Sequence, residues 1–496
     1  MKRRDFCKAS VIVGTAAALP AKELLAVAYG SIAEIVSDVP AITVSGTETV
    51  LEKAALTEFA ESLRGVVLVP GHNGYDAARR VWNGMIDKRP AVIARCTGSA
   101  DISRAVNFAR ERQLLVAVRG GGHSIPGKST CDGGLVIDLS PINGVRVDPV
   151  ARAARVGPGT LGGGMDREAQ YYGLATTLGT VSHTGVAGLT LGGGFGWLSR
   201  RFGLACDNLI SVDIVTADGT LRRVSAEENP DLFWALHGGG GNFGVVSSFE
   251  YRLHPVGPQV LAGRLVFPLS EARRIIEFYG EFAATAPREL NVDLGLETPP
   301  GGTLGAVIYV CYTGDPAIGE KLMAPLRKLG KPIEDTIGMT EYVKVQTQFD
   351  GLPRLPLSVY FKSGFITGFP AGLVDALADG FKPDAAFSSY FMHSGGAVAD
   401  KSETDTAFAH RDTLANMMMI GVWPNHENTP ENIATVRANW DMVKEHTSGF
   451  YVNLNEADDR TTHGNYGANY QRLVAIKKQY DPGNLFRLNA NIEPAS

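Results

Sequence analysis

The chain has few cysteines, and none of them is placed as metal-binding or redox motifs require. Five occur in 496 residues, at positions 7, 96, 131, 206 and 311, with no CxxC pair and no close cluster with histidine. This spacing argues against a zinc centre, and we expect no bound metal. Because a chain of this length can bury a large core without cross-links, we expect mostly buried free thiols.

An excess of basic residues and a long apolar run are missing as well. Lys and Arg number 47 against 52 Asp and Glu, which gives a net charge of -5. Nucleic acid and anionic lipid would therefore meet no dominant basic surface. The mildly apolar stretch at residues 9–21 is shorter than the about 20 residues that a membrane span needs. We expect a small-molecule substrate as the partner, no nucleic acid and no membrane span.

The N-terminus has the pattern of an export signal. Arg3 and Arg4 precede the apolar stretch, and the Ala-Val-Ala run at 26–28 offers a cleavage site. This pattern predicts a twin-arginine signal peptide over residues 1–28, with export to the periplasm, or to the medium from a cell without an outer membrane. The alternative is an ordinary surface-lying helix. Since the twin-arginine route carries folded proteins, the signal favours a cofactor loaded before export.

Length and local patterns predict more than one domain, since roughly 150 residues per domain gives two or three. Over residues 87–257, short β-rich runs alternate with helical patterns and glycine turns. Residues 258–445 show longer segments, which favour an antiparallel sheet with covering helices. We expect residues 29–86 to begin the first domain and residues 446–496 to complete it, with a strand at 451–453 and a helix near 466–479.

Glycine is abundant, and one glycine run fits a phosphate-binding motif. Residues 122–129 read GHSIPGKS, which matches GxxxxGK[ST] after a strand pattern. A phosphate-binding loop must open a helix, yet here a turn leads into a strand pattern at 135–139. Nucleotide hydrolysis is therefore a minor alternative.

Two further runs match GxGxxG without the context of a dinucleotide site. The run 239–244 follows a helical pattern and precedes a strand, which reverses the required order, and the run 157–162 lacks an acidic residue about 20 positions on. A classical NAD fold is not predicted. Three glycine-rich stretches in one domain, 119–124, 185–194 and 238–244, still allow close backbone approach to phosphates and flat rings. They favour a large, extended ligand.

With these motifs in this order, the chain resembles the FAD-linked oxidases of the berberine bridge enzyme group, within the vanillyl-alcohol oxidase type, from about residue 75 to 494. The marks are VRGGGHS at 118–124, GGGFG at 192–196, FGLACDN at 202–208, DLFWALHG at 231–238, GNFG at 241–244, YVN at 451–453 and YDPGNLF at 480–486. The resemblance implies an α+β fold, with a PCMH-type FAD-binding domain of two α/β subdomains and a substrate domain whose antiparallel sheet is covered by helices.

The same resemblance implies which residues hold FAD. His123 matches the histidine bonded to the flavin 8-methyl carbon, and the alternative is a hydrogen-bonding loop histidine. Many relatives form a second bond from a cysteine where this chain has Val181, so a single histidyl link is predicted. The implied cofactor-binding residues are Arg119, Gly120, Gly121, Gly122, His123, Ser124, Gly179, Thr180, His183, Thr184, Gly185, Gly188, Gly193, Gly244, Val245, Val246, Tyr451 and Asn453.

Oxidation of an alcohol or amine needs hydride transfer to the flavin and a base for the O–H or N–H proton. In the family the base is often the tyrosine of the Tyr-x-Asn segment, here Tyr451. Because free tyrosine has a pKa of about 10, a phenolate at neutral pH needs a nearby positive charge or several donors. Lys362, on a strand expected to face the flavin, is the candidate for that charge, and Tyr360 or Tyr466 could share the proton. The NMMM run at 416–419 supplies no carboxylate, and its methionines favour an apolar or aromatic substrate group.

Several functions stay open. The leading hypothesis is an oxidase that reoxidises its flavin with O2 and releases H2O2, and the second is a dehydrogenase of the same fold that uses an electron carrier. A phosphate-loop NTPase and a non-catalytic exported binding protein without cofactor are less favoured. Sugars, phenolic alcohols, polyketides and cyclic amines are all substrates of proteins with these motifs.

Overall fold

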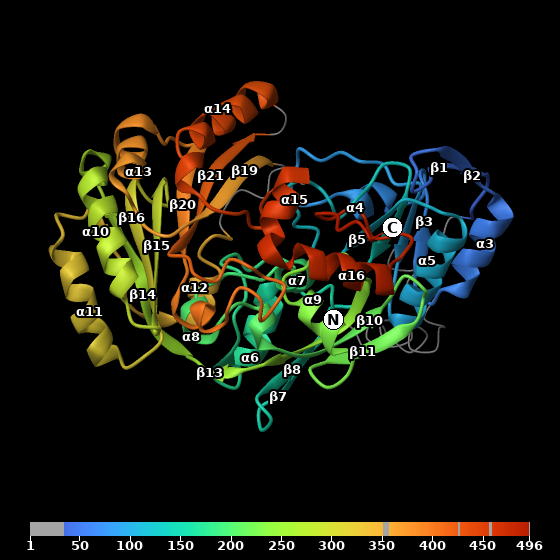
Figure 1. Ribbon diagram of the computed structural model, residues 1–496, viewed down its shortest axis with the longest axis horizontal. Helices are drawn as coiled ribbons and strands as arrows, with labels where there is room; N and C mark the ends of the chain where they lie inside the picture. Colours follow the sequence, from blue (N-terminus) through green and yellow to red (C-terminus); the bar gives the residue numbers. More distant parts are fainter. Residues whose placement is uncertain (1–33, 351–356, 425–426, 456–458, 496) are drawn as a thin grey trace, which may run out of the picture.

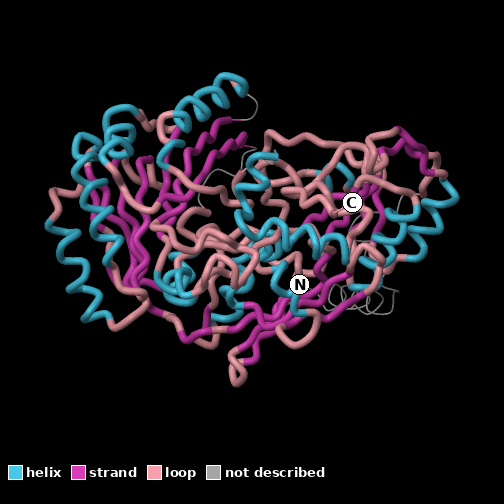
Figure 2. Tube along the Cα trace, in the orientation of Figure 1, coloured by secondary structure: helices cyan, strands magenta, loops and turns pink. Residues whose placement is uncertain are grey.

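The computed structural model describes residues 34–350, 357–424, 427–455 and 459–495, so the predicted signal peptide, with Cys7, lies outside the described residues. Two lobes lie side by side, and the C-terminal helices pack between them (Figure 1). Loops gather where the lobes meet (Figure 2). No helix in the described ranges is both long and apolar enough to cross a bilayer.

The first subdomain is built on a four-stranded sheet with the order β3-β4-β6-β5. Strands β4 and β5 run parallel to β6, whereas β3 runs antiparallel to β4. Helix α5 buries Ile102, Ala105, Val106 and Ala109 along one stripe, the spacing of an amphipathic helix. The elements are β1 Val39–Ile42, β2 Glu48–Leu51, α3 Lys53–Ser62, β3 Val66–Leu68, α4 Tyr75–Arg79, β4 Val92–Arg95, α5 Ser99–Glu111, β5 Val116–Arg119 and β6 Leu135–Asp138.

The second subdomain is an antiparallel five-stranded sheet with the order β11-β10-β12-β8-β7. The run 157–162 lies between strand β8 and helix α6, as predicted, and no helix follows Gly127 before β6 in this fully described stretch. The elements are β7 Val145–Asp148, β8 Ala153–Val156, α6 Gly162–Gln170, β9 Leu174–Ala175, α7 Val186–Leu191, α8 Ser199–Phe202, β10 Leu209–Val215, β11 Leu221–Ser225, α9 Pro230–Leu236, β12 Val245–Arg252 and β13 His254–Pro255.

The other lobe is an antiparallel sheet with the order β17-β14-β16-β15-β20-β21-β19, in which β18 also pairs with β14. Helices α10, α11, α13 and α14 lie on its outer face (Figure 1). The elements are β14 Gln259–Phe267, α10 Ala272–Thr285, β15 Leu290–Glu297, β16 Gly305–Tyr312, α11 Pro316–Lys328, β17 Glu334–Asp335, β18 Gly338–Glu341, α12 Tyr342–Gln346, β19 Leu357–Ile366, α13 Ala371–Asp375, β20 Phe387–His393, β21 Ala415–Pro424 and α14 Thr429–Asp441. The predicted fold class is confirmed.

Alternation along these strands sorts side chains between two faces. In β21, Met417 and Met419 pack in the core beneath the helices, whereas Met418 packs with the aromatic residues of the inner face. The inner face looks toward the glycine loops of the first lobe and lines the cavity described below. The sheet therefore forms the second wall of the site.

The C-terminal tail returns to the first lobe through α15 Asp459–Tyr466 and α16 Tyr470–Tyr480. The buried Lys477 amine donates to the carbonyl of Asn242 at 2.7 Å and to the Asp481 carboxylate at 2.7 Å, which fixes α16 against the loop at 238–244. The strand predicted at 451–453 is wrong. The segment is a turn, closed by the Leu454 N–H to the Tyr451 carbonyl at 3.0 Å, and the Asn453 amide donates to the Leu189 carbonyl. Asparagine favours such turns.

The cysteines of the described chain are free and buried, as predicted: Cys96, Cys131, Cys206 and Cys311. Burial raises the pKa of each thiol. Within the described ranges, no group of three or more His, Cys, Asp or Glu residues is placed to hold a metal ion.

Candidate functional site

A cavity of about 1310 Å³ separates the glycine loops of the first lobe from the inner face of the large sheet. This exceeds the ~300–1,000 Å³ typical of a drug-sized ligand. One wall includes residues 120–125, 179–181 and 183–185 with Asn453, and the other includes side chains of β19, β20 and β21. The volume therefore suits an extended cofactor together with a substrate.

Glycines shape the first wall by letting two backbone segments touch. A Cβ atom on Gly121 would lie 2.4 Å from the Gly185 Cα, and one on Gly185 would lie 2.5 Å from the Gly121 nitrogen. Gly188 has the opposite surroundings, since a Cβ there would meet nothing within 4 Å and the residue borders the cavity. The loops thus form a smooth cradle with exposed backbone, the surface that a phosphate chain and a flat ring need.

Gly121→Ala tests the cradle. We expect it to separate the two loops and to lower flavin occupancy of the purified protein by at least about tenfold, because the clash is with backbone that cannot rotate away. Gly144→Ala is the matched control, since its Cβ would meet nothing within 4 Å. Flavin absorbance per mole of protein measures both variants, and equal occupancy would contradict the assignment.

His123 stands on this wall with its ring fixed on two sides. The Trp82 ring stacks on it with centroids 4.1 Å apart and planes 15° apart, and its Nε2 lies 3.0 Å from Nδ1 of His183. Burial, followed by the neighbouring His183, lowers the pKa of His123 to about 3. At neutral pH the imidazole is therefore uncharged, the form in which a ring nitrogen is nucleophilic.

His183 connects His123 to an acidic group. Burial lowers the pKa of His183, and the Asp350 carboxylate opposes that shift. The Ser182 hydroxyl donates to Oδ2 of Asp350, while Oδ1 is buried without a hydrogen-bond partner. His183, one of the predicted cofactor-binding residues, is thus a hydrogen-bond partner of His123 within the protein.

Tyr451 lies at the back of the cavity in an aromatic cluster with Phe195, Phe365 and Phe408. Its hydroxyl oxygen accepts hydrogen bonds from the Gly194 N–H at 3.0 Å and from the Asn453 amide at 2.9 Å. These donors favour a phenolate, yet burial outweighs them and raises the pKa of Tyr451 to about 12. The role of Tyr451 as a base stays a prediction.

The expectation that Lys362 faces the flavin is wrong. In β19, Val359 and Phe361 line the cavity, so Tyr360 and Lys362 point to the helix-covered face. The Lys362 amine lies 5.5 Å from the centre of the Tyr360 ring.

The two tyrosines predicted to share the proton are also displaced from the cavity wall. Arg437 donates to the Tyr360 hydroxyl on the helix-covered face at 3.1 Å. The buried Tyr466 hydroxyl donates to the carbonyls of Gly239 and Ala490. None of these three side chains lines the described cavity.

The predicted cofactor-binding residues line the cavity with three exceptions. Arg119 turns its guanidinium to the carbonyl of Ala78, and its Nε is buried without a partner. Val245 is fully buried in the core. Gly193 lies behind the wall, since a Cβ there would be 2.8 Å from the Phe408 ring. The sequence analysis did not identify Trp82 as a site residue, because it belongs to no motif. It also did not identify three residues that only the folding of the second lobe brings to the cavity: Glu297, Phe349 and Tyr390.

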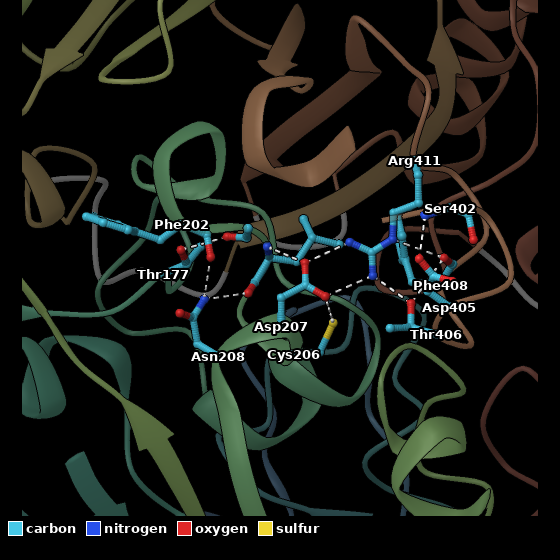
Figure 3. A network of polar contacts seen from close by, with 12 residues as sticks. Thr177, Phe202, Cys206, Asp207, Asn208, Ser402, Asp405, Thr406, Phe408 and Arg411 are labelled. Atoms are coloured by element: carbon cyan, nitrogen blue, oxygen red, sulfur yellow. Dashed lines mark hydrogen bonds and ion pairs between the residues drawn. The ribbon is translucent and has the colours of Figure 1, made fainter. Parts of the chain in front are cut away.

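A buried ion pair supports the glycine loop from behind (Figure 3). Arg411 donates to the two carboxylate oxygens of Asp207 at 2.7 and 2.9 Å. Backbone N–H groups of Ala205 and Cys206 donate to the carbonyls of Gly194 and Gly193, both at 2.9 Å. The conspicuous run at 202–208 therefore positions the cavity wall from outside the cavity.

Comparison with known proteins adds sequence and fold matches. Residues 90–225 match a family model described as an FAD binding domain, and residues 450–493 match one described as berberine and berberine like. The chain is 32% identical over 452 residues to an FAD-linked oxidoreductase of Dictyostelium discoideum, covering 88% of this chain and 97% of the relative. It is 31% identical over 454 residues to (R)-6-hydroxynicotine oxidase of Paenarthrobacter nicotinovorans, covering 87% and 97%.

Solved structures match over the same span. The crystal structure of 6-hydroxy-D-nicotine oxidase from Arthrobacter nicotinovorans superposes with a TM-score of 0.80 at 30% identity, covering 88% of this chain and 99% of that one. The carbohydrate oxidase from Microdochium nivale gives a TM-score of 0.81 at 25% identity, covering 89% and 100%.

Proposed function

This chain belongs to the berberine-type FAD-linked oxidoreductases, and we propose that it oxidises an alcohol or amine group by hydride transfer to an FAD held covalently by His123. The observation that carries the proposal is the position of the His123 imidazole, which Trp82 and His183 fix on the wall of a cavity of about 1310 Å³. Bound flavin supplies the two-electron acceptor for the substrate hydride.

Other residues of the chain would bind and position the flavin. Gly120, Gly121 and Gly188 offer backbone for the phosphates and the ring, and Asn453 completes that wall. His123 would hold the flavin through a ring nitrogen; forming that bond would release one hydrogen from the imidazole and one from the flavin methyl group, with O2 as the acceptor of the two electrons. With Val181 where a thiol would be needed for a second bond, one histidyl link is proposed.

We propose that O2 also accepts the electrons of turnover, with H2O2 released. A dehydrogenase of the same fold would instead reduce an added dye while producing no peroxide. The assay is peroxide formation in air, run beside dye reduction without O2, over a panel of alcohols, amines and sugars. Dye reduction without peroxide formation would show a dehydrogenase in place of an oxidase. Protein purified without flavin would contradict both functions.

His183→Ala tests the setting of His123. We expect the rate of covalent flavin incorporation to fall by about tenfold or more, because the ring loses the partner that fixes its orientation. His183→Gln keeps a side chain that can form a hydrogen bond with His123 and should restore part of the rate. The measurement is the acid-stable flavin fraction over time after FAD is added to apoprotein, and an unchanged rate would remove His183 from the process.

We also propose that residues 1–28 direct export through the twin-arginine route. Replacement of Arg3 and Arg4 by lysine should retain the protein in the cytoplasm, as measured by fractionation. Correct export of that variant would contradict the signal.

A further inference from the structure

The substrate side of the cavity is mostly apolar where the strands β19, β20 and β21 form it, and Ser388 and Tyr390 are its polar members. Phe361, Met392, Met418 and Ile420 line it. A sugar would leave several hydroxyl groups against these side chains without hydrogen-bond partners, and burial of unpaired hydroxyl groups is unfavourable. These walls fit an apolar or aromatic frame.

Four carboxyl groups of the described residues line the cavity, and three of them are held by polar partners. Arg79 pairs with Asp87, the Ser182 hydroxyl donates to Asp350, and backbone N–H groups of Ala386 and Phe387 donate to Asp384. The fourth, Glu297, lies among aromatic rings.

Glu297 ends β15, lines the cavity and remains partly exposed to it. Its Oε1 accepts a hydrogen bond from the Tyr309 hydroxyl at 2.6 Å. The nearby Arg264 instead pairs with Glu334 at 2.8 Å, and no described residue forms a salt bridge with Glu297. The acid therefore has no ion-pair partner within the described protein, although Arg264 is close enough to favour its charged form.

Aromatic rings surround the acid. Phe349 and Tyr390 also line the cavity, with ring centres 6.2 Å apart, and Tyr309 lies 5.5 Å from Phe349. Trp197 stacks against Phe349 with planes 8° apart. Ring faces beside a carboxylate attract cations.

We propose that Glu297 is the counter-ion for a basic nitrogen of the substrate, so that this enzyme acts on an amine with an apolar or aromatic frame. The inference rests on the proposed function, because it assumes that the cavity also holds the flavin. Glu297 selects the substrate by ion pairing, and Phe349 and Tyr390 add ring contacts to the same nitrogen.

The surroundings of Glu297 set the pH dependence of that selection. Burial raises the pKa of Glu297 to about 7, which the Tyr309 hydrogen bond and Arg264 oppose and Asp293 assists. Tyr390 is uncharged there, since burial raises the pKa of its hydroxyl, which donates to Asp293 at 2.8 Å. The raised pKa means that the binding form, the carboxylate, grows as pH rises through about 7. Amine affinity should rise over that window until the amine itself loses its proton.

The experiment titrates flavin-loaded protein, without O2, with matched pairs of probes: benzylamine against benzyl alcohol, and cyclohexylamine against cyclohexanol, with cellobiose as a sugar. Binding is read from the flavin absorbance and from the fluorescence of the protein, which contains Trp197 beside the cavity rings. We expect each amine to bind about tenfold to a hundredfold more tightly than its alcohol. Glu297→Gln should abolish that preference, whereas the exposed Glu320→Gln on α11 should preserve it.

Tyr309→Phe keeps the carboxyl group and removes a hydrogen bond that lowers its pKa, so the midpoint for amine affinity should move to higher pH. Equal binding of amines and alcohols, no binding of any amine, or a preference that survives Glu297→Gln would each overturn the proposal. These outcomes are distinct from failure of the proposed function, which would appear as protein without flavin absorbance.

Discussion

His123→Ala is expected to release all of its flavin into the supernatant on acid precipitation, while the precipitate of the unchanged protein stays yellow. The reason is chemical, since alanine has no nitrogen that can bond to the flavin. The glycine cradle remains, because Gly121 and Gly185 still meet, so the variant should bind FAD without a bond. Mass spectrometry of the denatured chain should show one FAD on the unchanged protein and none on the variant.

His463→Ala is the matched control for this experiment. His463 is exposed on α15 and contacts Tyr470, so its removal should leave covalent flavin unchanged. A yellow precipitate from His123→Ala would show that the flavin is bonded to another residue. A white precipitate from the unchanged protein that still binds FAD would leave the oxidoreductase assignment in place and remove the covalent link.

The cofactor wall could be predicted from the sequence because the glycine runs that form it can be recognised there. Glycine is required wherever two backbone segments approach as closely as Gly121 and Gly185 do, and no other residue leaves the wall as open as at Gly188. The family motifs extended this to His123 and Asn453. The prediction failed for Arg119, Gly193 and Val245, since which residues of a segment face the cavity depends on how that segment folds.

The substrate wall was harder to predict because its strands are buried on both faces. Alternation of polar and apolar residues marks the inner face only when the other face meets water, and helices cover the outer face here. Lys362 was therefore assigned to the wrong face of β19. The strand predicted at 451–453 was wrong for another reason. Tyr451 and Val452 favour strands, but the Asn453 amide donates a hydrogen bond to the Leu189 carbonyl and ends any extended segment.

The sequence analysis could not identify Glu297 as a site residue, because a carboxylate at the end of a strand is usually solvated. The surroundings that set its role come from Tyr309 of the neighbouring strand β16, whose hydroxyl donates a hydrogen bond to it, and from Phe349, which packs on Tyr309 from a distant segment. Contacts between residues far apart in the chain determine the charge state of the group. The same holds for Asp207 and Arg411, which are separated by 204 positions.

Arg411→Ala is expected to lower the free energy of unfolding by about 3–5 kcal/mol, because it leaves the Asp207 carboxylate buried without its counter-ion. The two side chains are only 1% and 4% exposed, so water cannot replace the guanidinium. Chemical denaturation and thermal melting measure the loss. We also expect weaker flavin retention, since the backbone of Ala205 and Cys206 beside Asp207 holds Gly193 and Gly194, which lie directly behind the cavity wall.

Arg288→Ala isolates the contribution of burial. Arg288 pairs with Asp400 through two hydrogen bonds of 2.6 Å, a geometry as good as that of the Arg411 pair, but its side chain is 54% exposed and that of Asp400 is 50% exposed. Solvent screens exposed ion pairs, so this variant should melt close to the unchanged protein. Equal loss in both variants would contradict the role of burial. The double variant Asp207→Leu with Arg411→Met should recover much of the stability lost in Arg411→Ala, because no unpaired charge then remains in the interior.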